Sequence, residues 1–180
     1  EAITAYQTLL EKYPNSQRTA KASLELGMTY RTLKKYNEAI KAFKHTVSTY
    51  IGSEEAYSAL EGIEQILVET NKVDEYIAYT KTLTNINMEA ISSEDSLVYV
   101  TAEIQYMMGN YEQAAAGLTT YLTSFCPGGR YCTNATYYAA NSFYQLKQYD
   151  QAVEQYSALA DIQGNPYMEE ACMRVAELSY

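Results

Sequence analysis

Apolar residues recur along this chain at intervals of three and four, which places their side chains on one face of an α-helix. Ala22, Leu26 and Tyr30 form one such face, and Ala39 and Phe43 begin another after a short break. No segment alternates between apolar and polar residues as a strand would, so the pattern predicts an all-α fold. The helices are expected at residues 1–13, 17–34, 37–50, 54–71, 74–87, 93–109, 111–125, 131–147, 150–163 and 167–180.

The helical pattern repeats at a nearly constant interval. A column of mostly small residues runs through Ala2, Ala39, Tyr76, Ala114 and Ala152, with spacings of 37, 37, 38 and 38 residues. Equal spacing of this kind is typical of solenoids, in which pairs of helices stack against their neighbours. We therefore expect a single solenoid over residues 1–180. Its expected parts are a half repeat 1–14, full repeats 15–52, 53–90, 91–129 and 130–164, and a half repeat 165–180.

The helical pairs resemble those of the tetratricopeptide (TPR) repeat family. That family places Leu-Gly and Tyr on the first helix and Ala and an aromatic residue on the second. Glu64 and Tyr76 stand where Gly and Ala are expected, so we expect local irregularity around them. The resemblance implies an α-α superhelix of about four full repeats. The best matches are Leu26-Gly27 with Tyr30, Ala39 and Phe43, and Ala139-Ala140 with Phe143, Ala152 and Tyr156.

TPR-like solenoids hold partners in a concave groove lined by the first helix of each pair, so the resemblance implies a non-catalytic scaffold for a protein or peptide. The chain contains 20 Tyr, three Phe and no Trp. Tyrosine offers rigid contact area together with a hydroxyl group, which suits peptide binding. Packing between helices explains the same tyrosines equally well. The candidate groove residues, from helices 93–109 and 131–147, are Tyr99, Glu103, Tyr106, Tyr137, Asn141 and Tyr144.

Charge is unevenly spread along the chain, whose net charge is −9. Residues 1–50 carry a net charge of +4, residues 51–115 carry −10, and residues 116–180 carry −3. An acidic middle repels phosphate backbones, so nucleic acid is not expected as a partner. A basic partner surface is one explanation of the acidic segment, and an acidic face in contact with solvent is the other.

Catalytic and metal chemistry are not expected from these residues. The single histidine, His45, lies within a helical pattern, and a general base requires partner groups that no neighbouring motif supplies. Three cysteines and one remote histidine do not form a cluster of metal ligands. We therefore expect no catalytic residues, no metal and no cofactor. No apolar stretch approaches the roughly 20 residues that would cross a bilayer, so this segment is not expected to insert into a membrane.

Cys126 and Cys132 flank a loop that contains Pro127-Gly128-Gly129. A disulfide between them would join two consecutive helices and would indicate an oxidising compartment. Two free thiols in a cytosolic protein are the alternative, because pairing cannot be deduced from sequence alone. Cys172 lies on an apolar face of its helix, where we expect it to pack as a small hydrophobic residue.

The phrase Glu11-Lys12-Tyr13-Pro14-Asn15-Ser16, followed by an Ala-rich helix, is similar to repeats of bacterial cell-envelope proteins such as outer-membrane assembly lipoproteins. This resemblance favours the periplasm or cell envelope over the cytoplasm. The chain opens within a helical pattern and without Met, so we expect a piece of a longer protein. Besides a protein-binding scaffold, the sequence leaves open a structural spacer or self-assembly module, and a carbohydrate- or small-ligand-binding envelope protein.

Overall fold

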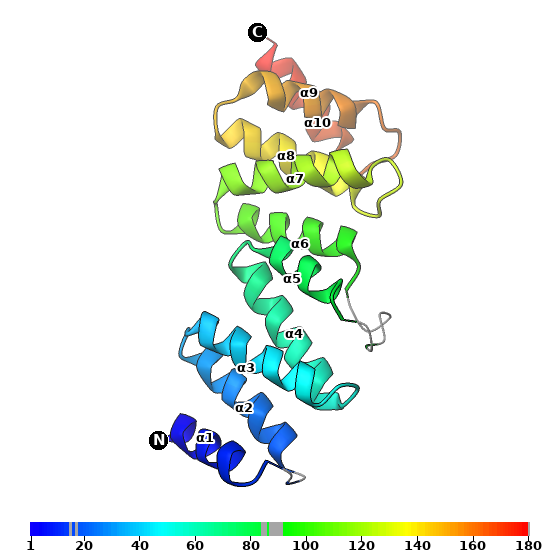
Figure 1. Ribbon diagram of the computed structural model, residues 1–180. Coiled ribbons are helices and arrows are strands. Elements are labelled where there is room, and N and C mark those ends of the chain that lie inside the picture. Colours follow the sequence, from blue (N-terminus) through cyan, green and yellow to red (C-terminus); the bar gives the residue numbers. More distant parts are fainter. Residues whose placement is uncertain (15, 17, 84–85, 87–91, 180) are drawn as a thin grey trace. The chain divides into compact units, whose positions relative to one another are not determined.

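The computed structural model describes residues 1–14, 16, 18–83, 86 and 92–179 (Figure 1). Within these residues the chain forms helices and turns and no strand, which confirms the predicted all-α class. The helices are α1 (Ala2–Lys12), α2 (Thr19–Thr32), α3 (Tyr36–Thr49), α4 (Glu54–Glu69), α5 (Val73–Thr80), α6 (Glu94–Met107), α7 (Tyr111–Phe125), α8 (Cys132–Gln145), α9 (Tyr149–Ala160) and α10 (Met168–Leu178).

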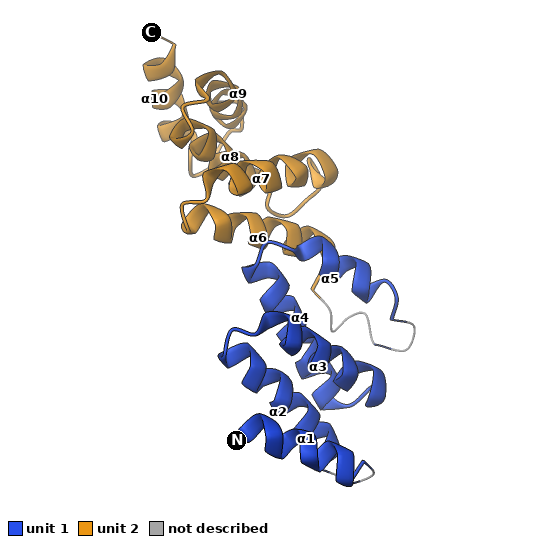
Figure 2. Cartoon of the chain, turned by 60° about the vertical axis from the view of Figure 1, so that its left-hand side comes forward, with its two compact units in different colours: residues 1–91 blue, residues 92–180 orange. Residues whose placement is uncertain are grey.

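The chain divides into two compact units, residues 1–91 and 92–180 (Figure 2). In the first unit each helix packs against the next, from α1 to α5, and α2 also contacts α4. In the second unit each helix packs against the next, from α6 to α10, and α6 also contacts α8. Contact between the first helices of successive pairs, as in α2–α4 and α6–α8, is the arrangement expected when helical pairs stack. The single solenoid over 1–180, with its repeat boundaries, stays a prediction.

The turn inside each helical pair has the same backbone geometry. Gly109 has a positive φ of 78° and its N–H donates to the Tyr106 carbonyl at 2.9 Å. The Asn110 N–H then donates to the Gln105 carbonyl at 2.9 Å, which completes a Schellman stop of the preceding helix. This stop recurs at intervals of 37, 38 and 38 residues, close to those of the small-residue column. Its left-handed residues are Lys34, Asn71, Gly109 and Lys147.

Two of these turns carry lysine where glycine fits best. Lys147 has a φ of 60°, a region in which a Cβ crowds the backbone and glycine does not. We expect Lys147→Gly to raise the free energy of unfolding by about 0.5–1 kcal/mol in urea titrations. Lys147→Ala is the matched control, because it removes the same side chain and keeps the Cβ. Equal stability of the Gly and Ala variants would contradict this explanation.

The core of the first unit is centred on Phe43 of α3, whose ring is completely buried. A Cβ on Gly27 of α2 would overlap the ring, and a Cβ on Gly62 of α4 would lie 2.8 Å from it. The ring therefore lies between two glycines from different helical pairs. The Leu-Gly motif at Leu26-Gly27 thus has a direct packing reason, whereas the contact from Gly62 was not expected from the sequence.

At the site of the expected irregularity, Glu64 and Tyr76 interact with each other. Tyr76 is the fourth residue of α5, the position that Ala39 occupies in α3, and its ring is buried. Burial raises the pKa of the Tyr76 hydroxyl, and the Glu64 carboxylate raises it further as a nearby charge and as a hydrogen-bond acceptor. The hydroxyl therefore stays protonated and has a polar partner inside the unit.

The predicted helix boundary that departs furthest from the structure is the end of the helix expected over residues 74–87. The helix expected over residues 74–87 begins at Val73 and ends at Thr80. The Thr82 and Leu83 N–H groups donate to carbonyls three residues earlier, which is a tightened turn rather than a continued α-helix. Part of the remaining predicted span, residues 84–85 and 87, lies outside the described residues.

Candidate functional site

The six candidate groove residues all lie in the second unit, on α6 and α8. The structure separates them by exposure. Glu103, Tyr106, Tyr137 and Tyr144 are partly exposed, whereas Tyr99 is 2% exposed and Asn141 is 8% exposed. Tyr99 and Asn141 are therefore interior residues, and they do not offer contact area to a partner.

Tyr99 is fixed in the interior by aromatic and polar contacts. Its ring stacks on Tyr131 with a centroid distance of 4.3 Å and an angle of 5° between the ring planes. Its hydroxyl donates to Glu103 Oε1 at 2.7 Å. Burial raises the pKa of Tyr99, and the Glu103 carboxylate adds to the effect. Packing between helices, the alternative left open by the sequence, is the role of this tyrosine.

Asn141 has a comparable structural role one helix later. Its Oδ1 accepts a hydrogen bond from the Tyr156 hydroxyl at 2.7 Å, and both side chains are buried. Burial raises the pKa of Tyr156, so the hydroxyl remains a donor. The pair links α8 to α9 and satisfies two buried polar groups.

The partly exposed tyrosines continue into a row of touching rings, which we call the aromatic strip. Its members come from α6, from the first residue of α7, from α8 and from the residue before α10. Successive ring centroids along it are 5.7, 4.8, 5.4 and 3.9 Å apart. The first three distances lie within the range of favourable aromatic contact, and the last belongs to two nearly parallel rings in a close stack. All five side chains are partly exposed. In order, the aromatic strip consists of Tyr111, Tyr106, Tyr138, Tyr137 and Tyr167.

Two carboxylates lie beside the aromatic strip. Glu170 Oε2 accepts a hydrogen bond from the Tyr137 hydroxyl at 2.9 Å, and Glu103 lies close enough to Tyr138 to influence its charge. Burial raises the pKa of Tyr106, Tyr137 and Tyr138, and the neighbouring carboxylates raise these pKa values further. The hydroxyls are therefore protonated at neutral pH, and the surface combines apolar rings, hydroxyl donors and negative charge.

Tyr144 lies outside the aromatic strip. The Arg174 guanidinium lies 4.8 Å from the centroid of its ring, a cation–π distance, and donates to Glu177 Oε2 at 3.0 Å. The Tyr149 ring is 6.0 Å from the Tyr144 ring at 60°. These contacts occupy Tyr144 with neighbours inside the unit, so it is a weaker candidate than Tyr106 and Tyr137.

Three members of the aromatic strip were not predicted: Tyr111, Tyr138 and Tyr167. A repeated signal could have identified Tyr111. Tyr106 and Tyr111 make an edge-to-face pair at 5.7 Å, and Tyr144 and Tyr149 make the equivalent pair 38 residues later. The spacing Tyr-x₄-Tyr across the turn thus occurs twice in this chain with the same ring geometry. The repetition can be seen in the sequence once the period is known.

The loop before α8 supports the ring stack at Tyr99. Cys126 and Cys132 are joined by a disulfide, with their Cα atoms 5.7 Å apart. Between them, the Tyr131 N–H donates to the Tyr121 hydroxyl at 3.0 Å, which holds Tyr131 against Tyr99. Cys172, expected to pack as a small hydrophobic residue, is exposed on α10, so that expectation is wrong.

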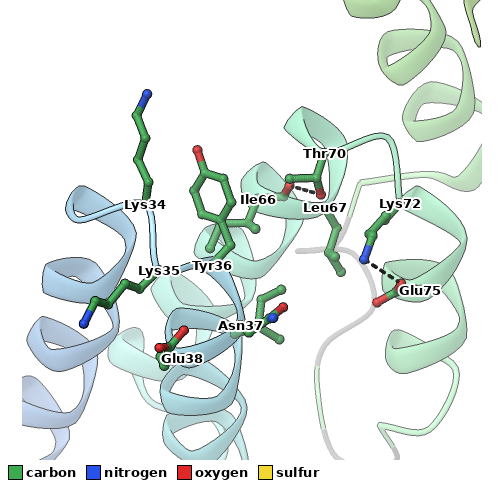
Figure 3. Close-up of a pocket in the computed structure, with 11 residues that line it drawn as sticks. Lys34, Lys35, Tyr36, Asn37, Glu38, Ile66, Leu67, Thr70, Lys72 and Glu75 are labelled. Atoms are coloured by element: carbon green, nitrogen blue, oxygen red, sulfur yellow. Dashed lines mark hydrogen bonds and ion pairs between the residues drawn. The ribbon is translucent and has the colours of Figure 1, made fainter.

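A second candidate site is a pocket of 330 Å³ in the first unit. It lies between the α2–α3 turn, the end of α4 and the start of α5. Lys72 and Glu75 form an ion pair of 3.5 Å on one side, while Lys34 and Lys35 point away from that pair (Figure 3). The basic groups thus do not converge on one point, and lysine and glutamate both line the pocket. This arrangement specifies no particular ligand.

No cluster of metal ligands is assembled in the described part of the chain. His45 is exposed on α3, with Nδ1 3.5 Å from the Thr49 hydroxyl. Among the described residues no group of three or more His, Cys, Asp and Glu side chains could hold a metal ion. Within the same residues, every helix is too short or too polar to span a bilayer.

Comparison with known proteins identifies one matching family. The model of the family described as "Tetratricopeptide repeat" matches residues 1–53 and 99–166. No curated protein matches the chain.

Similar solved structures are found at low sequence identity and with TM-scores below 0.5. MamA is 15% identical, with 91% of this chain and 82% of that chain covered and a TM-score of 0.43. YrrB, described as a TPR protein with an unusual peptide-binding site, is 12% identical, with 98% of this chain and 82% of that chain covered and a TM-score of 0.43. A tetratricopeptide repeat protein from Parabacteroides merdae is 15% identical, with 98% of this chain and 64% of that chain covered and a TM-score of 0.44.

Proposed function

The chain belongs to the tetratricopeptide repeat family, and from this premise we propose that it is a scaffold that binds a protein partner through the aromatic strip. Repeat proteins of this family are generally non-catalytic and serve as interaction modules. We propose that the partner contributes an extended peptide segment, and that the strip is the surface on which this segment lies.

The aromatic strip is the observation that carries this proposal. Five tyrosine rings touch one another and remain partly exposed, although tyrosines that only fill the interior, such as Tyr121 and Tyr156, are fully buried. Tyrosine is enriched among residues that dominate binding energy, because it presents a large rigid surface with few rotatable bonds. An exposed aromatic row is therefore better explained by binding than by packing alone.

The test is selection of peptides on the immobilised protein. We expect a phage-displayed library of random peptides to yield sequences that bind the wild-type chain. The double variant Tyr106→Ala/Tyr138→Ala should weaken their binding by about tenfold or more, because it removes adjacent rings from the middle of the strip. Fluorescence anisotropy with the selected peptides measures the effect.

The matched control is Tyr13→Ala, which removes an exposed tyrosine in the first unit. Peptides that use the strip should bind this variant as they bind the wild type. Circular dichroism of the double variant establishes that its helices are intact before affinities are compared. Failure to enrich any peptide, or equal affinity for the double variant, would remove the aromatic strip as the binding surface.

A further inference from the structure

We propose that the aromatic strip recognises a proline-rich segment that carries lysine or arginine. This inference rests on the proposed function and specifies the chemistry of the partner. It follows from three properties of the second unit: the absence of an unpaired sheet edge among its described residues, the apolar ring faces of the strip, and the sign of the nearby charge.

The second unit offers a peptide backbone no ladder of hydrogen bonds. Its described residues, 92–179, form helices and turns, whose backbone groups bond within the helices and caps. A peptide can add as a strand only where a sheet edge leaves N–H and C=O groups unpaired. A bound segment must therefore satisfy its own backbone through side chains of the strip or through water.

The faces of the rings in the strip are apolar, and the polar atoms lie at the hydroxyls and at the neighbouring carboxylates. Among the described residues, the Tyr106 and Tyr138 hydroxyls have no hydrogen-bond partner, and burial keeps them protonated as donors. The carboxylates of Glu103 and Glu170 each accept one hydrogen bond, from Tyr99 and Tyr137, and keep further lone pairs for a charged donor from a ligand. An ordinary peptide would place an N–H per residue over the rings, where loss of water without a new acceptor is unfavourable.

Proline avoids the cost of an unpaired backbone N–H over the rings, because it has no backbone N–H while its carbonyl still accepts. A proline-rich segment also occupies the polyproline II helix before binding, so less conformational entropy is lost. The contacts Tyr106–Tyr138 and Tyr138–Tyr137, at 4.8 and 5.4 Å, together span at most about 10 Å. One polyproline II turn rises about 9 Å, which lies within this upper limit.

The charge around the strip favours a basic residue in the ligand. Between residues 92 and 180 the chain has ten Asp and Glu against three Lys and Arg. Glu103 and Glu170 lie beside the rings, and Arg174 is engaged with Tyr144 and Glu177. A lysine or arginine among the prolines would meet these carboxylates, whereas an acidic residue would be repelled.

The experiment compares three labelled peptides of about ten residues by fluorescence anisotropy with the full chain. The first is a run of prolines interrupted by lysines, the second has glutamate in place of lysine, and the third has alanine and glycine in place of proline. We expect the first to bind about tenfold or more tightly than each of the others. Glu170→Gln should weaken its binding about threefold or more, and added salt should do the same.

Tyr106→Ala/Tyr138→Ala should abolish binding of the proline–lysine peptide, and Tyr13→Ala should leave it unchanged. Equal binding of the alanine–glycine peptide would overturn the preference for proline, and equal binding of the glutamate peptide would overturn the preference for a basic residue. Selected peptides that lack proline and yet depend on Tyr106 and Tyr138 would overturn this inference alone, with the scaffold function intact. If no selected peptide depends on Tyr106 and Tyr138 and the proline–lysine peptide does not bind, both the proposed scaffold function of the strip and this inference would be wrong.

Discussion

Phe43→Ala is expected to lower the free energy of unfolding of the first unit by about 3–5 kcal/mol. The Phe43 ring is 0% exposed and lies between Gly27 and Gly62, so its removal leaves a cavity bordered by residues that have no side chain to fill it. The destabilisation reaches the upper part of the range when the surroundings cannot collapse into the space.

Urea unfolding followed by circular dichroism gives this free energy, and hydrogen exchange assigns it to a region. Amides of α2, α3 and α4 should exchange about 100-fold or more faster in the variant, while those of α8 and α9 should be unaffected. Leu33→Ala is the control, because Leu33 is 55% exposed and its loss should change stability by less than about 0.5 kcal/mol. A loss below about 1 kcal/mol for Phe43→Ala would contradict the packing of the ring between the glycines.

Titration of the denatured, unreduced protein is expected to find one free thiol, that of Cys172. Reduction of the bond between Cys126 and Cys132 should lower the free energy of unfolding of the second unit by about 2 kcal/mol, because the bond closes only a short loop. Part of this loss would arise from the loop itself, where the Tyr131 N–H bonds to the Tyr121 hydroxyl.

Cys126→Ser/Cys132→Ser should reproduce the effect of reduction, and Cys172→Ser should leave stability unchanged since Cys172 is exposed. Urea titrations with and without reductant measure both differences. Three free thiols in the unreduced protein would mean that the disulfide does not form under the conditions of purification.

Helix positions could be predicted from the sequence because apolar spacing and turn residues act locally. The start of α7 at Tyr111 and its end at Phe125 were both expected, and α9 begins within one residue of its predicted start. The end of α5 was not, because Leu83 lies seven residues after Tyr76 and so continues its helical face in the sequence, while the backbone there tightens into a turn.

The candidate site was predicted less completely, for a reason of geometry. Spacing of three and four along one helix selected Tyr99 together with Tyr106, but it cannot distinguish a face that meets solvent from one that meets a neighbouring helix. Tyr99 meets Tyr131, and Asn141 meets Tyr156. The aromatic strip instead crosses from helix to helix and uses the sequence neighbours Tyr137 and Tyr138, a relation that no single-helix pattern contains.

The pairing of Glu64 with Tyr76 also could not be predicted from a pattern along one helix. Each residue alone departs from the family pattern, and a pattern of preferred residues counts both as mismatches. Only the packing of α4 against α5 shows that one residue supplies the polar partner of the other.

The position of Phe43 between two glycines has a consequence for cooperativity. In a repeat array, stability divides into an intrinsic contribution from each repeat and a coupling contribution from each junction between neighbours. One edge of this ring lies against Gly27, within the pair α2–α3, and the opposite edge lies against Gly62, at the junction with α4. The same side chain therefore contributes to both quantities, so Phe43→Ala is expected to weaken the pair α2–α3 and its junction with α4 together.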